Sequence, residues 1–516
     1  MLTRVRPLVC AAAATAALAL SACGGGGGGV SSDDPASLAP ASAPLYIQAT
    51  LRPTGKLKTN VVKLASTVSA IKDPLGQVVS LIDQSLADNK PLSGKSQTFE
   101  KDFEPWIGTR AGVFVEGFSG NPPAAGIVQT TDPAATQKTI DDGREKGDKQ
   151  RSYKGVDYLV DQGGTAVGVV GDFLVVGNEK ALKDAVDVSK GDIDPLGEKS
   201  DFTKTLDQAP SGSLADAYVS LEGVTSEIRA NDPQSAKGFE GAVGDTSGKS
   251  ILASLVPASD SAELDLSTNA SQNIQLTDLS KLIGTLPGQS FAALGIPDLG
   301  SRVGETIDQL QKAGIQGVSR KAIDQQLALT GISLDDITKA LGDLGIFAEG
   351  SDRGSLQGAG VIASSDPMAA KNLIGKIAKL ALSSGQKGIQ PAAGGNGFSI
   401  TDPANLGRQP LTITASGDKI VIGYGQQATA QALTGGGGTL GDDPTYKQAT
   451  GALGGSGVSG YFSLSKIFGL ADALGALHDP GYVQARPYLN HLSYAVLGSA
   501  SKGDFSTSKV IVGVKP

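Results

Sequence analysis

The stretch GIVQTTDP at residues 126–133 decides how this chain folds, because it returns as GVIASSDP at residues 360–367. Each copy begins with apolar and small residues, which predict a β-strand. Each copy then ends in Asp-Pro. Asp is a favoured residue at a helix N-cap, and Pro is favoured at the first helical position. Both stretches therefore predict a strand that leads directly into a helix.

Further landmarks recur in the same order in both halves of the chain. They are GVFVEG at 112–117 and GIFAEG at 345–350, GDFLVVG at 171–177 and GDKIVIG at 417–423, and YVSL at 218–221 and YFSL at 461–464. Sequence rich in Gly and Ala resembles itself by chance, but chance does not preserve the order of landmarks. We therefore expect a tandem duplication, with one unit at residues 38–269 and a second at 281–516.

Each predicted unit combines helices with strands that are mostly joined as hairpins. Apolar residues spaced by three and four predict helices before the first strands, around Val61 and Leu64 in the first unit and around Val303 and Ile307 in the second. Hairpins are predicted at residues 251–266 and 492–514. The expected fold class is α+β, with helices packed on a mostly antiparallel sheet in each unit. Parallel crossovers stay open at this point.

The first residues have the pattern of an export signal. Arg4 and Arg6 precede an apolar run from Leu8 to Leu20, which is too short to span a membrane. Leu, Ser and Ala directly before Cys23 resemble the lipobox of bacterial lipoproteins, which implies a diacylglycerol on Cys23 after removal of residues 1–22. The alternative is an ordinary cleavage site with a chance Cys. A run of six Gly follows Cys23, so residues 23–37 are expected to be a flexible tether.

Composition limits the classes of function. The chain of 516 residues has a formal net charge of −8, which disfavours a protein that holds nucleic acid or an anionic bilayer through cationic patches. Cys10 would leave with the signal and Cys23 would be acylated. We therefore expect neither a disulfide framework nor a thiolate metal site. Length favours two or more domains.

Two glycine-containing motifs resemble phosphate-binding loops and are interpreted as turns. Residues 423–428 read GYGQQA between a strand and a helix, as a dinucleotide site requires, but the aligned residues 177–180 keep the same geometry without the second Gly. Residues 244–250 read GDTSGKS, one residue short of a P-loop, and no strand leads into them. No cofactor is predicted from either motif.

Other candidate chemistry is sparse. Ser463 and Lys466 have the Ser-x-x-Lys spacing of some exported hydrolases, but the accompanying elements are missing, so Lys466 is expected to be solvated. Only two His residues exist, and His478-Asp479-Pro480 is interpreted as the end of a helix over 467–477 followed by a turn. We predict no metal site and no catalytic residues. The protein is expected not to be an enzyme.

Several of these features together resemble an uncharacterised bacterial envelope family, domain of unknown function 3352. They are the Cys-anchored start, Leu38-Ala39-Pro40 before a strand at 45–47, Pro105-Trp106-Ile107-Gly108 before a Val-rich strand, the Asp-Pro helix starts and the Gly-Asp strands. The second half departs from the pattern at Ala340, where the first has Trp106. The resemblance implies no activity, cofactor or catalytic residue.

The sequence thus predicts an exported protein held on the extracytoplasmic side of a cell membrane by a lipid on Cys23. Its leading function is a non-catalytic binding or scaffold module of the envelope. An envelope lipid, glycan or protein stays open as the partner. One alternative is a carrier with an internal cavity for a lipid or apolar ligand, motivated by abundant Val, Leu, Ile and Gly. An exported hydrolase is the other alternative.

Overall fold

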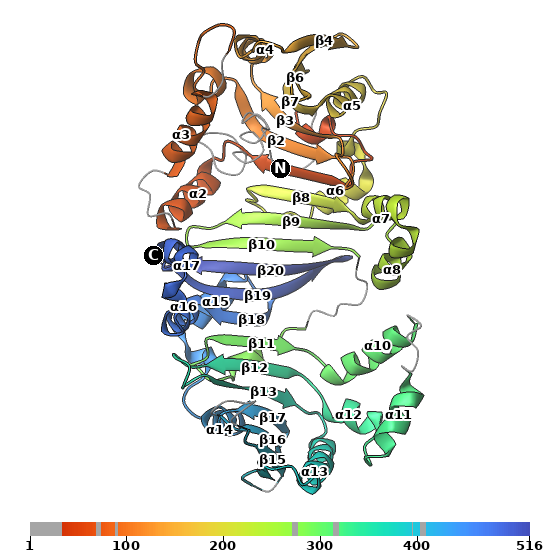
Figure 1. The fold of residues 1–516 in the computed structure, drawn as a ribbon, viewed down its shortest axis with the longest axis vertical. Coiled ribbons are helices and arrows are strands. Elements are labelled where there is room, and N and C mark those ends of the chain that lie inside the picture. Colours follow the sequence, from red (N-terminus) through yellow and green to blue (C-terminus); the bar gives the residue numbers. More distant parts are fainter. Residues whose placement is uncertain are drawn as a thin grey trace. The chain divides into compact units, whose positions relative to one another are not determined.

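The computed structural model describes residues 33–68, 74–87, 91–270, 277–312, 319–394, 396–402 and 409–515. The fold is α+β, as predicted, with helices around antiparallel β-structure (Figure 1). The chain divides into two compact units. Unit 1 comprises Met1–Ile274 and Ser501–Ser508, and unit 2 comprises Gln275–Ala500 and Lys509–Pro516.

Unit 1 is built on ten strands. They are β1 (Leu45–Thr50), β2 (Ile107–Val115), β3 (Ala124–Thr130), β4 (Lys149–Tyr153), β5 (Val156–Val160), β6 (Thr165–Val170), β7 (Phe173–Asn178), β8 (Ala215–Ser220), β9 (Ser250–Pro257) and β10 (Ser261–Thr268). The pairings place them in the order β4-β5-β6-β7-β3-β2-β1-β8-β9-β10, all antiparallel.

The helices of unit 1 connect these strands. They are η1 (Pro35–Ser37), α2 (Gly55–Val68), α3 (Pro74–Ala87), the π-helical turn η2 (Phe99–Phe103), α4 (Pro133–Asp142), α5 (Glu179–Ser189), η3 (Leu196–Glu198), α6 (Ser200–Leu206), α7 (Leu221–Asn231) and α8 (Pro233–Val243). Helix α2 and helix α7 lie at opposite ends of β8 and β9 (Figure 1).

The described residues of unit 2 also carry ten strands, the last two of which run into the Ser501–Ser508 segment that belongs to unit 1. They are β11 (Ala292–Ile296), β12 (Leu344–Glu349), β13 (Gln357–Ala363), β14 (Ile389–Pro391), β15 (Gly397–Ile400), β16 (Leu411–Ser416), β17 (Lys419–Tyr424), β18 (Gly457–Ser463), β19 (Leu492–Lys502) and β20 (Phe505–Val514). Their order is β14-β15-β16-β17-β13-β12-β11-β18-β19-β20.

The helices of unit 2 are α9 (Ser280–Gly284), α10 (Leu299–Lys312), α11 (Arg320–Ala328), α12 (Leu334–Ala340), α13 (Pro367–Ser383), α14 (Gln426–Thr434), η4 (Leu440–Asp442), α15 (Pro444–Ala452), α16 (Leu464–Ala473), η5 (Ala476–His478) and α17 (Pro480–Leu489). The strand order of unit 2 repeats that of unit 1, position by position. This shared strand order is what a tandem duplication predicts. That the units have a common ancestor stays an inference.

The predicted strand-to-helix steps form as expected in both units. The Asp132 carboxylate accepts a hydrogen bond of 2.9 Å from the Ala135 N–H, and Asp366 accepts one of 2.9 Å from the Ala369 N–H. Pro follows directly at the first helical position in each case. These caps satisfy N–H groups that have no partner within the helix.

One face of each sheet carries the main core. In unit 1, Tyr46 pairs across the sheet with Phe114 and Tyr218, and the Phe202 ring meets both tyrosine rings edge-on at 5.5 and 5.0 Å. In unit 2, Tyr446 and Tyr461 meet edge-on at 5.2 Å. Edge-to-face packing is favoured by the ring quadrupoles. Buried aromatic side chains thus lie at the centre of both cores.

Two boundaries differ from the predictions. The fold was expected to begin near Leu38, but η1 starts at Pro35, Asp34 is its N-cap, and Asp34 is 1% exposed because it pairs with Arg110. Asp34–Ser37 therefore belong to the folded unit and not to a tether. Asp479 was expected in a turn after a helix, but it caps α17 and accepts a hydrogen bond of 2.8 Å from the Tyr482 N–H.

In the part of the chain that the structure describes, no helix combines the length and the hydropathy that a membrane span requires.

A candidate binding pocket beside Trp106

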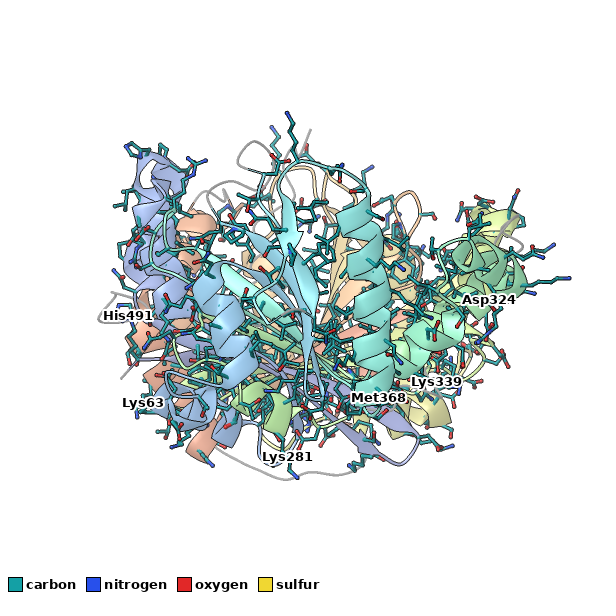
Figure 2. The ribbon with its side chains drawn as sticks, turned by 90° about the horizontal axis from the view of Figure 1, so that it is seen from below. Lys63, Lys281, Asp324, Lys339, Met368 and His491 are labelled. Carbon is teal, nitrogen blue, oxygen red and sulfur yellow. The ribbon has the colours of Figure 1, made fainter. Side chains whose placement is uncertain are left out.

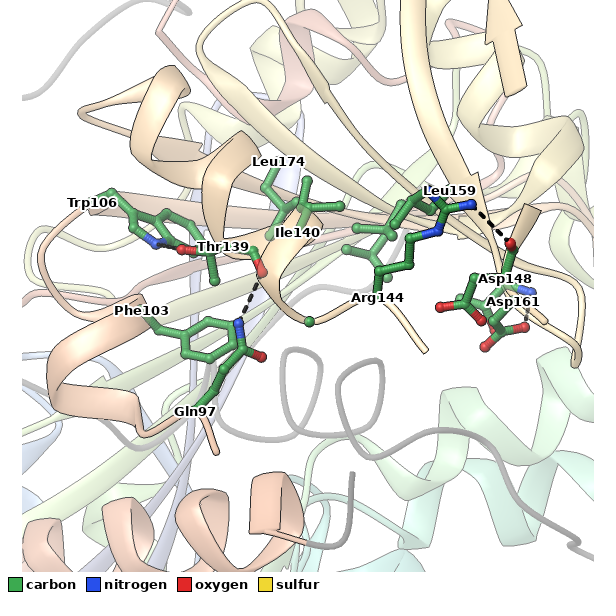
Figure 3. Close-up of a pocket in the computed structure, with 14 residues that line it drawn as sticks. Gln97, Phe103, Trp106, Thr139, Ile140, Arg144, Asp148, Leu159, Asp161 and Leu174 are labelled. Carbon is green, nitrogen blue, oxygen red and sulfur yellow. Dashed lines mark hydrogen bonds between the residues drawn. The ribbon is translucent and has the colours of Figure 1, made fainter. Parts of the chain in front are cut away.

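A pocket lies between the sheet of unit 1 and the segments that cover its β3–β7 end. Helix α4, the η2 turn and the connection from α4 to β4 form its walls, and β5, β6 and β7 form its floor. Figure 3 shows Gln97, Phe103 and Trp106 on one side and Arg144, Asp148 and Asp161 on the other. The pocket thus collects side chains from segments that are far apart in the sequence.

Hydrogen bonds hold Trp106, the single Trp of the chain, in a fixed orientation. Its indole N–H donates to the Asp102 carbonyl at 2.6 Å and to Thr139 Oγ1 at 3.1 Å. The Phe103 ring packs against the indole at a centroid distance of 5.9 Å. Trp106 is 3% exposed. A buried Trp usually finds such a partner for its N–H, and here the bonds tie η2 to α4.

The floor of the pocket is apolar. Cross-strand pairing places Leu159 beside Val167, Val167 beside Val176, and Leu174 on the same face. Ile140 of α4 covers these residues from above. The same face continues through Gly126 and Val113 toward β1. The pocket is therefore one end of a longer apolar sheet surface.

Polar groups gather at one side of the pocket, which we call its mouth. Arg144 Nε is buried and has no hydrogen-bond partner among the described residues. Asp148 accepts a hydrogen bond of 2.9 Å from the Glu145 N–H, and Asp161 Oδ1 accepts bonds of 2.7 and 2.9 Å from the N–H groups of Gly163 and Thr165. Arg144 Nε–H is thus a buried donor in the pocket lining that no described residue satisfies, and an acceptor atom of a ligand could pair with it.

The pocket is small, with a cavity volume of about 70 Å³. Sites that enclose a whole drug-sized ligand occupy roughly 300–1,000 Å³. An apolar end of a ligand fits this pocket, and the rest of the ligand would lie outside its mouth.

The aligned region of unit 2 is filled. Counting from the N-caps Asp132 and Asp366, Thr139 aligns with Leu373 and Gly143 aligns with Ile377. Leu373 is 4% exposed, and Leu373 and Ile377 pack with the apolar cluster under α13. Helix α13 continues to Ser383, whereas α4 ends at Asp142. A shorter helix and smaller side chains therefore open the pocket in unit 1.

Cys23, the one site residue predicted from the sequence, lies outside the described residues. The predicted attachment of a lipid to it stays a prediction.

The dinucleotide-like motif of unit 2 is explained by local packing. A side chain at Gly423 would come within 2.1 Å of Thr429 Oγ1, and one at Gly425 would come within 2.7 Å of the Gln357 side chain. Gly425 also has a φ of 98°, which other residues rarely adopt. Gln357 Oε1 accepts the Ala428 N–H at 3.2 Å, so a protein group occupies a position where a phosphate would bind.

The remaining candidates serve structural contacts. Lys466, expected to be solvated, is partly buried, and its ammonium donates to the carbonyls of Gly288 and Ser290 at 3.1 and 3.3 Å. His478 Nδ1 lies 2.8 Å from the Gly475 carbonyl. Over the described ranges, no group of three or more His, Cys, Asp or Glu side chains is placed to hold a metal ion. The GDTSGKS residues lie between α8 and β9.

Sequence reasoning missed the pocket, although Trp106 itself was prominent. One signal was available: Gly143 stands at the helix position where the aligned copy has Ile377. Between two units with the same strand order, such a loss of side-chain volume indicates a space that other side chains must fill or leave open.

Comparison with known proteins gives a family but no activity. No curated protein matches the chain. Crystal form I of TP0453 is 12% identical, with a TM-score of 0.27, and the match covers 49% of this chain and 86% of that one. Crystal form III is 14% identical, with a TM-score of 0.25 and coverage of 48% and 86%. The family described as "Protein of unknown function (DUF3352)" matches residues 8–473, so the chain belongs to this family.

Proposed function

We propose that this protein is a lipid-anchored, non-catalytic binding module of the cell envelope, which holds the apolar end of a ligand in the pocket beside Trp106. The observation that supports this most directly is the open pocket of unit 1 at the place where Leu373 and Ile377 of unit 2 pack in an apolar cluster. Burying apolar surface there would provide the binding free energy, and the Arg144 Nε–H would select an oxygen-bearing ligand.

The size of the pocket distinguishes this proposal from a carrier that encloses a whole lipid. About 70 Å³ accommodates only one end of an alkyl chain or a small ring. The ligand therefore stays attached to, or extends into, its surroundings. This fits an anchored binding module better than a carrier that must shield its cargo.

Trp106 gives a direct test, because it lines the pocket and is the only Trp. The probe is dodecanoic acid brominated at its terminal carbon, since bromine quenches an indole that it contacts. We expect saturable quenching of Trp106 fluorescence by the probe. Quenching that rises linearly, without saturation, would contradict binding in the pocket.

The matched variant is Gly143→Leu. Gly143 has ordinary helical backbone angles, and a new Cβ would meet mainly the end of the flexible Gln97 side chain, at 2.9 Å. A Leu side chain there should fill the pocket and weaken probe binding by at least about tenfold. Gly241→Leu is the control, because Gly241 lies on exposed α8 with open space around it. Equal binding by the two variants would refute the pocket as the site.

Lipid attachment has its own test at Cys23. Cells that express the full chain are labelled with radioactive palmitate, and the Cys23→Ala variant is compared with the natural sequence. We expect the natural chain to carry the label and the variant to lose it. Label of equal strength on Cys23→Ala would rule out this anchor without affecting the pocket.

A further inference from the structure

The sheet of unit 1 has a second apolar surface, on the face opposite its aromatic core. Its side chains come from β2, β1, β8, β9 and β10 in three cross-strand rows. The rows are Val113-Ile47-Ala217-Ala253-Leu266, Ala111-Ala49-Ala215-Leu255-Leu264 and Val115-Leu45-Val219-Ile251-Thr268. Only Thr268 in these rows has a polar side chain. We call this surface the outer face.

Much of the outer face is open to solvent. Ile47, Leu255, Leu264 and Leu266 are 37–40% exposed, whereas Tyr46 on the core face is 1% exposed. An antiparallel sheet with one solvated face normally alternates apolar and polar residues. Here the exposed face is apolar, while the opposite face carries the aromatic core and the polar row Gln48-Asp216-Ser254-Asp265. An exposed, continuous apolar surface usually marks a site of interaction.

A basic amphipathic helix borders the outer face. Helix α2 contains Lys56, Lys58 and Lys63 and no acidic residue, and none of its residues is buried. Lys63 projects from the ribbon in Figure 2. The helix is fixed beside β9 by a hydrogen bond of 2.9 Å from the Asn60 side chain to the Pro257 carbonyl. A positive rim thus adjoins an apolar floor in a protein whose net charge is −8.

The other end of the outer face opens into a groove against α7. Val219 of the third row lines it together with Phe118, Val224 and Ile228, and its volume is about 430 Å³. Pro257, beside α2, is the last residue of β9, while Ser250 at the start of β9 pairs with Ser220 beside α7. Seven residue steps separate these ends, or roughly 23 Å. One leaflet of a bilayer has a hydrocarbon depth of roughly 15 Å, so an extended acyl chain fits along the face.

We propose that the outer face of unit 1 binds an anionic phospholipid, with its headgroup against the lysines of α2 and its acyl chains along the sheet toward the α7 groove. Charge complementarity favours this occupant: Thr268 is the one polar side chain in the three rows, the lysines of α2 are positive, and the acidic Glu227 and Asp232 line the groove at the far end, away from a negative headgroup. An amphiphile with a negative head matches this arrangement. The outer face continues the sheet face that forms the pocket floor, but its residues lie on other strands, and the proposal does not depend on ligand binding beside Trp106.

The test uses the full chain carrying Cys23→Ala, so that an acyl anchor cannot attach it to membranes. Flotation is measured with vesicles of phosphatidylcholine alone and with vesicles containing phosphatidylglycerol. We expect binding to the anionic vesicles only. Three lysines near a membrane surface contribute roughly a 100-fold increase in affinity, so the triple variant Lys56→Gln, Lys58→Gln and Lys63→Gln should lose most of it.

The matched control replaces Lys371, Lys379 and Lys387 by Gln in unit 2. It removes the same charge from exposed positions on or next to α13, a helix whose apolar side is already buried. It should bind as the parent does. A second variant, Leu255→Gln with Leu266→Gln, should also reduce binding, because it makes exposed floor positions polar.

Three outcomes would overturn the proposal. The first is equal flotation with neutral and anionic vesicles, and the second is equal loss in the test and control lysine variants. The third is a dimer in sedimentation experiments that Leu255→Gln with Leu266→Gln dissociates while vesicle binding stays absent, since the outer face would then bind a second copy of the chain. Failure of Trp106 quenching in the pocket experiment would leave this proposal intact.

Discussion

The two units share one strand order but differ in how side chains fill the space under the helix that follows the third strand, α4 in unit 1 and α13 in unit 2. In unit 1, α4 ends at Asp142 and leaves a pocket beside Trp106; in unit 2, α13 extends to Ser383 and its Leu373 and Ile377 fill the aligned space. The same scaffold therefore supports an open site and a closed core. What differs is helix length and the volume of a few side chains, as expected when function is added to a fold locally.

The difference between α4 and α13 also explains why unit 1 has a large aromatic residue, Trp106, where unit 2 has a small one. The aligned position in unit 2 is Ala340, which is fully buried against the α13 cluster. In unit 1, Trp106 supplies side-chain volume on one side of the pocket, while Thr139 and Gly143 are smaller than the aligned Leu373 and Ile377. The two units thus fill the aligned space with side chains from different elements, and the pocket beside Trp106 remains in unit 1.

The largest effect on stability is expected from Trp106→Ala, which removes the aromatic side chain that only unit 1 has at this position. The indole is 3% exposed and donates two hydrogen bonds, so its removal should cost unit 1 about 3–5 kcal/mol of unfolding free energy. Urea unfolding followed by circular dichroism measures the loss, and Trp106→Phe should lose less. A loss below about 1 kcal/mol would show that the indole does not support the fold.

In unit 2 the corresponding change is Leu373→Ala. Leu373 is 4% exposed within the apolar cluster, so a cavity there should cost about 3 kcal/mol. Circular dichroism should show an earlier transition, while Trp106 fluorescence, which reports on unit 1, should stay unchanged. Met368→Ala on the same helix is the control, because Met368 is 70% exposed (Figure 2). A shift in Trp106 fluorescence would instead show that the units unfold together.

The unfolding free energies of the two units should also depend on pH, through one carboxyl in each unit. This effect is expected to be smaller than those of the two core substitutions. Burial raises the pKa of Glu116 to about 7, and Asp184 adds to the shift while Lys180, 2.9 Å away, opposes it. Burial also raises the pKa of Glu349, whose side chain accepts a hydrogen bond from Gln357. A carboxyl with a raised pKa binds its proton more tightly in the folded state. For Glu116, this contribution to stability is therefore present below pH 4.5 and is lost as the pH rises through about 7; for Glu349 the change has the same sign.

The expected loss at Glu116 across this interval is about 1–3 kcal/mol. Its side chain is 14% exposed, so solvent screens it only partly. Glu116→Gln should flatten the dependence of the Trp106-monitored unfolding free energy on pH. If the natural chain and the variant change in parallel between pH 4.5 and 7, the carboxyl of Glu116 does not titrate in this range.

The smallest effect should be equal in the two units. Asp132→Ala and Asp366→Ala each remove one N-cap hydrogen bond of the same length, so each should cost about 1 kcal/mol. Asn at either position should restore most of the stability, because its side chain also caps. Unequal losses, measured by urea unfolding, would show that the two strand-to-helix steps are not equivalent.

Prediction succeeded where structure depends on near neighbours. The Asp-Pro steps and the hairpin of β9 and β10 rest on residues a few positions apart, and all are present. It was wrong for Asp34, whose burial depends on Arg110, 76 residues away. It was also wrong for Lys466, whose partners Gly288 and Ser290 precede it by more than 170 residues.

The candidate site could not be predicted for the same reason, because it depends on contacts between residues far apart in the sequence. Trp106 could be noticed in the sequence, but the pocket requires Gln97, Thr139, Arg144 and Leu174 to meet around it. No local pattern encodes that meeting. Gly143 indicates open space only when it is compared with Ile377, the residue at the aligned position of unit 2.

By itself, then, the sequence determined the α+β class, the strand-to-helix steps and the repeated order of landmarks, because periodicity and caps act within one or two turns of chain. Only the tertiary structure decided where space remains and which apolar residues stay exposed. The Trp106 pocket and the outer face depend on the register of five or more strands and on the point where a covering helix ends. Those are properties of packing between distant segments.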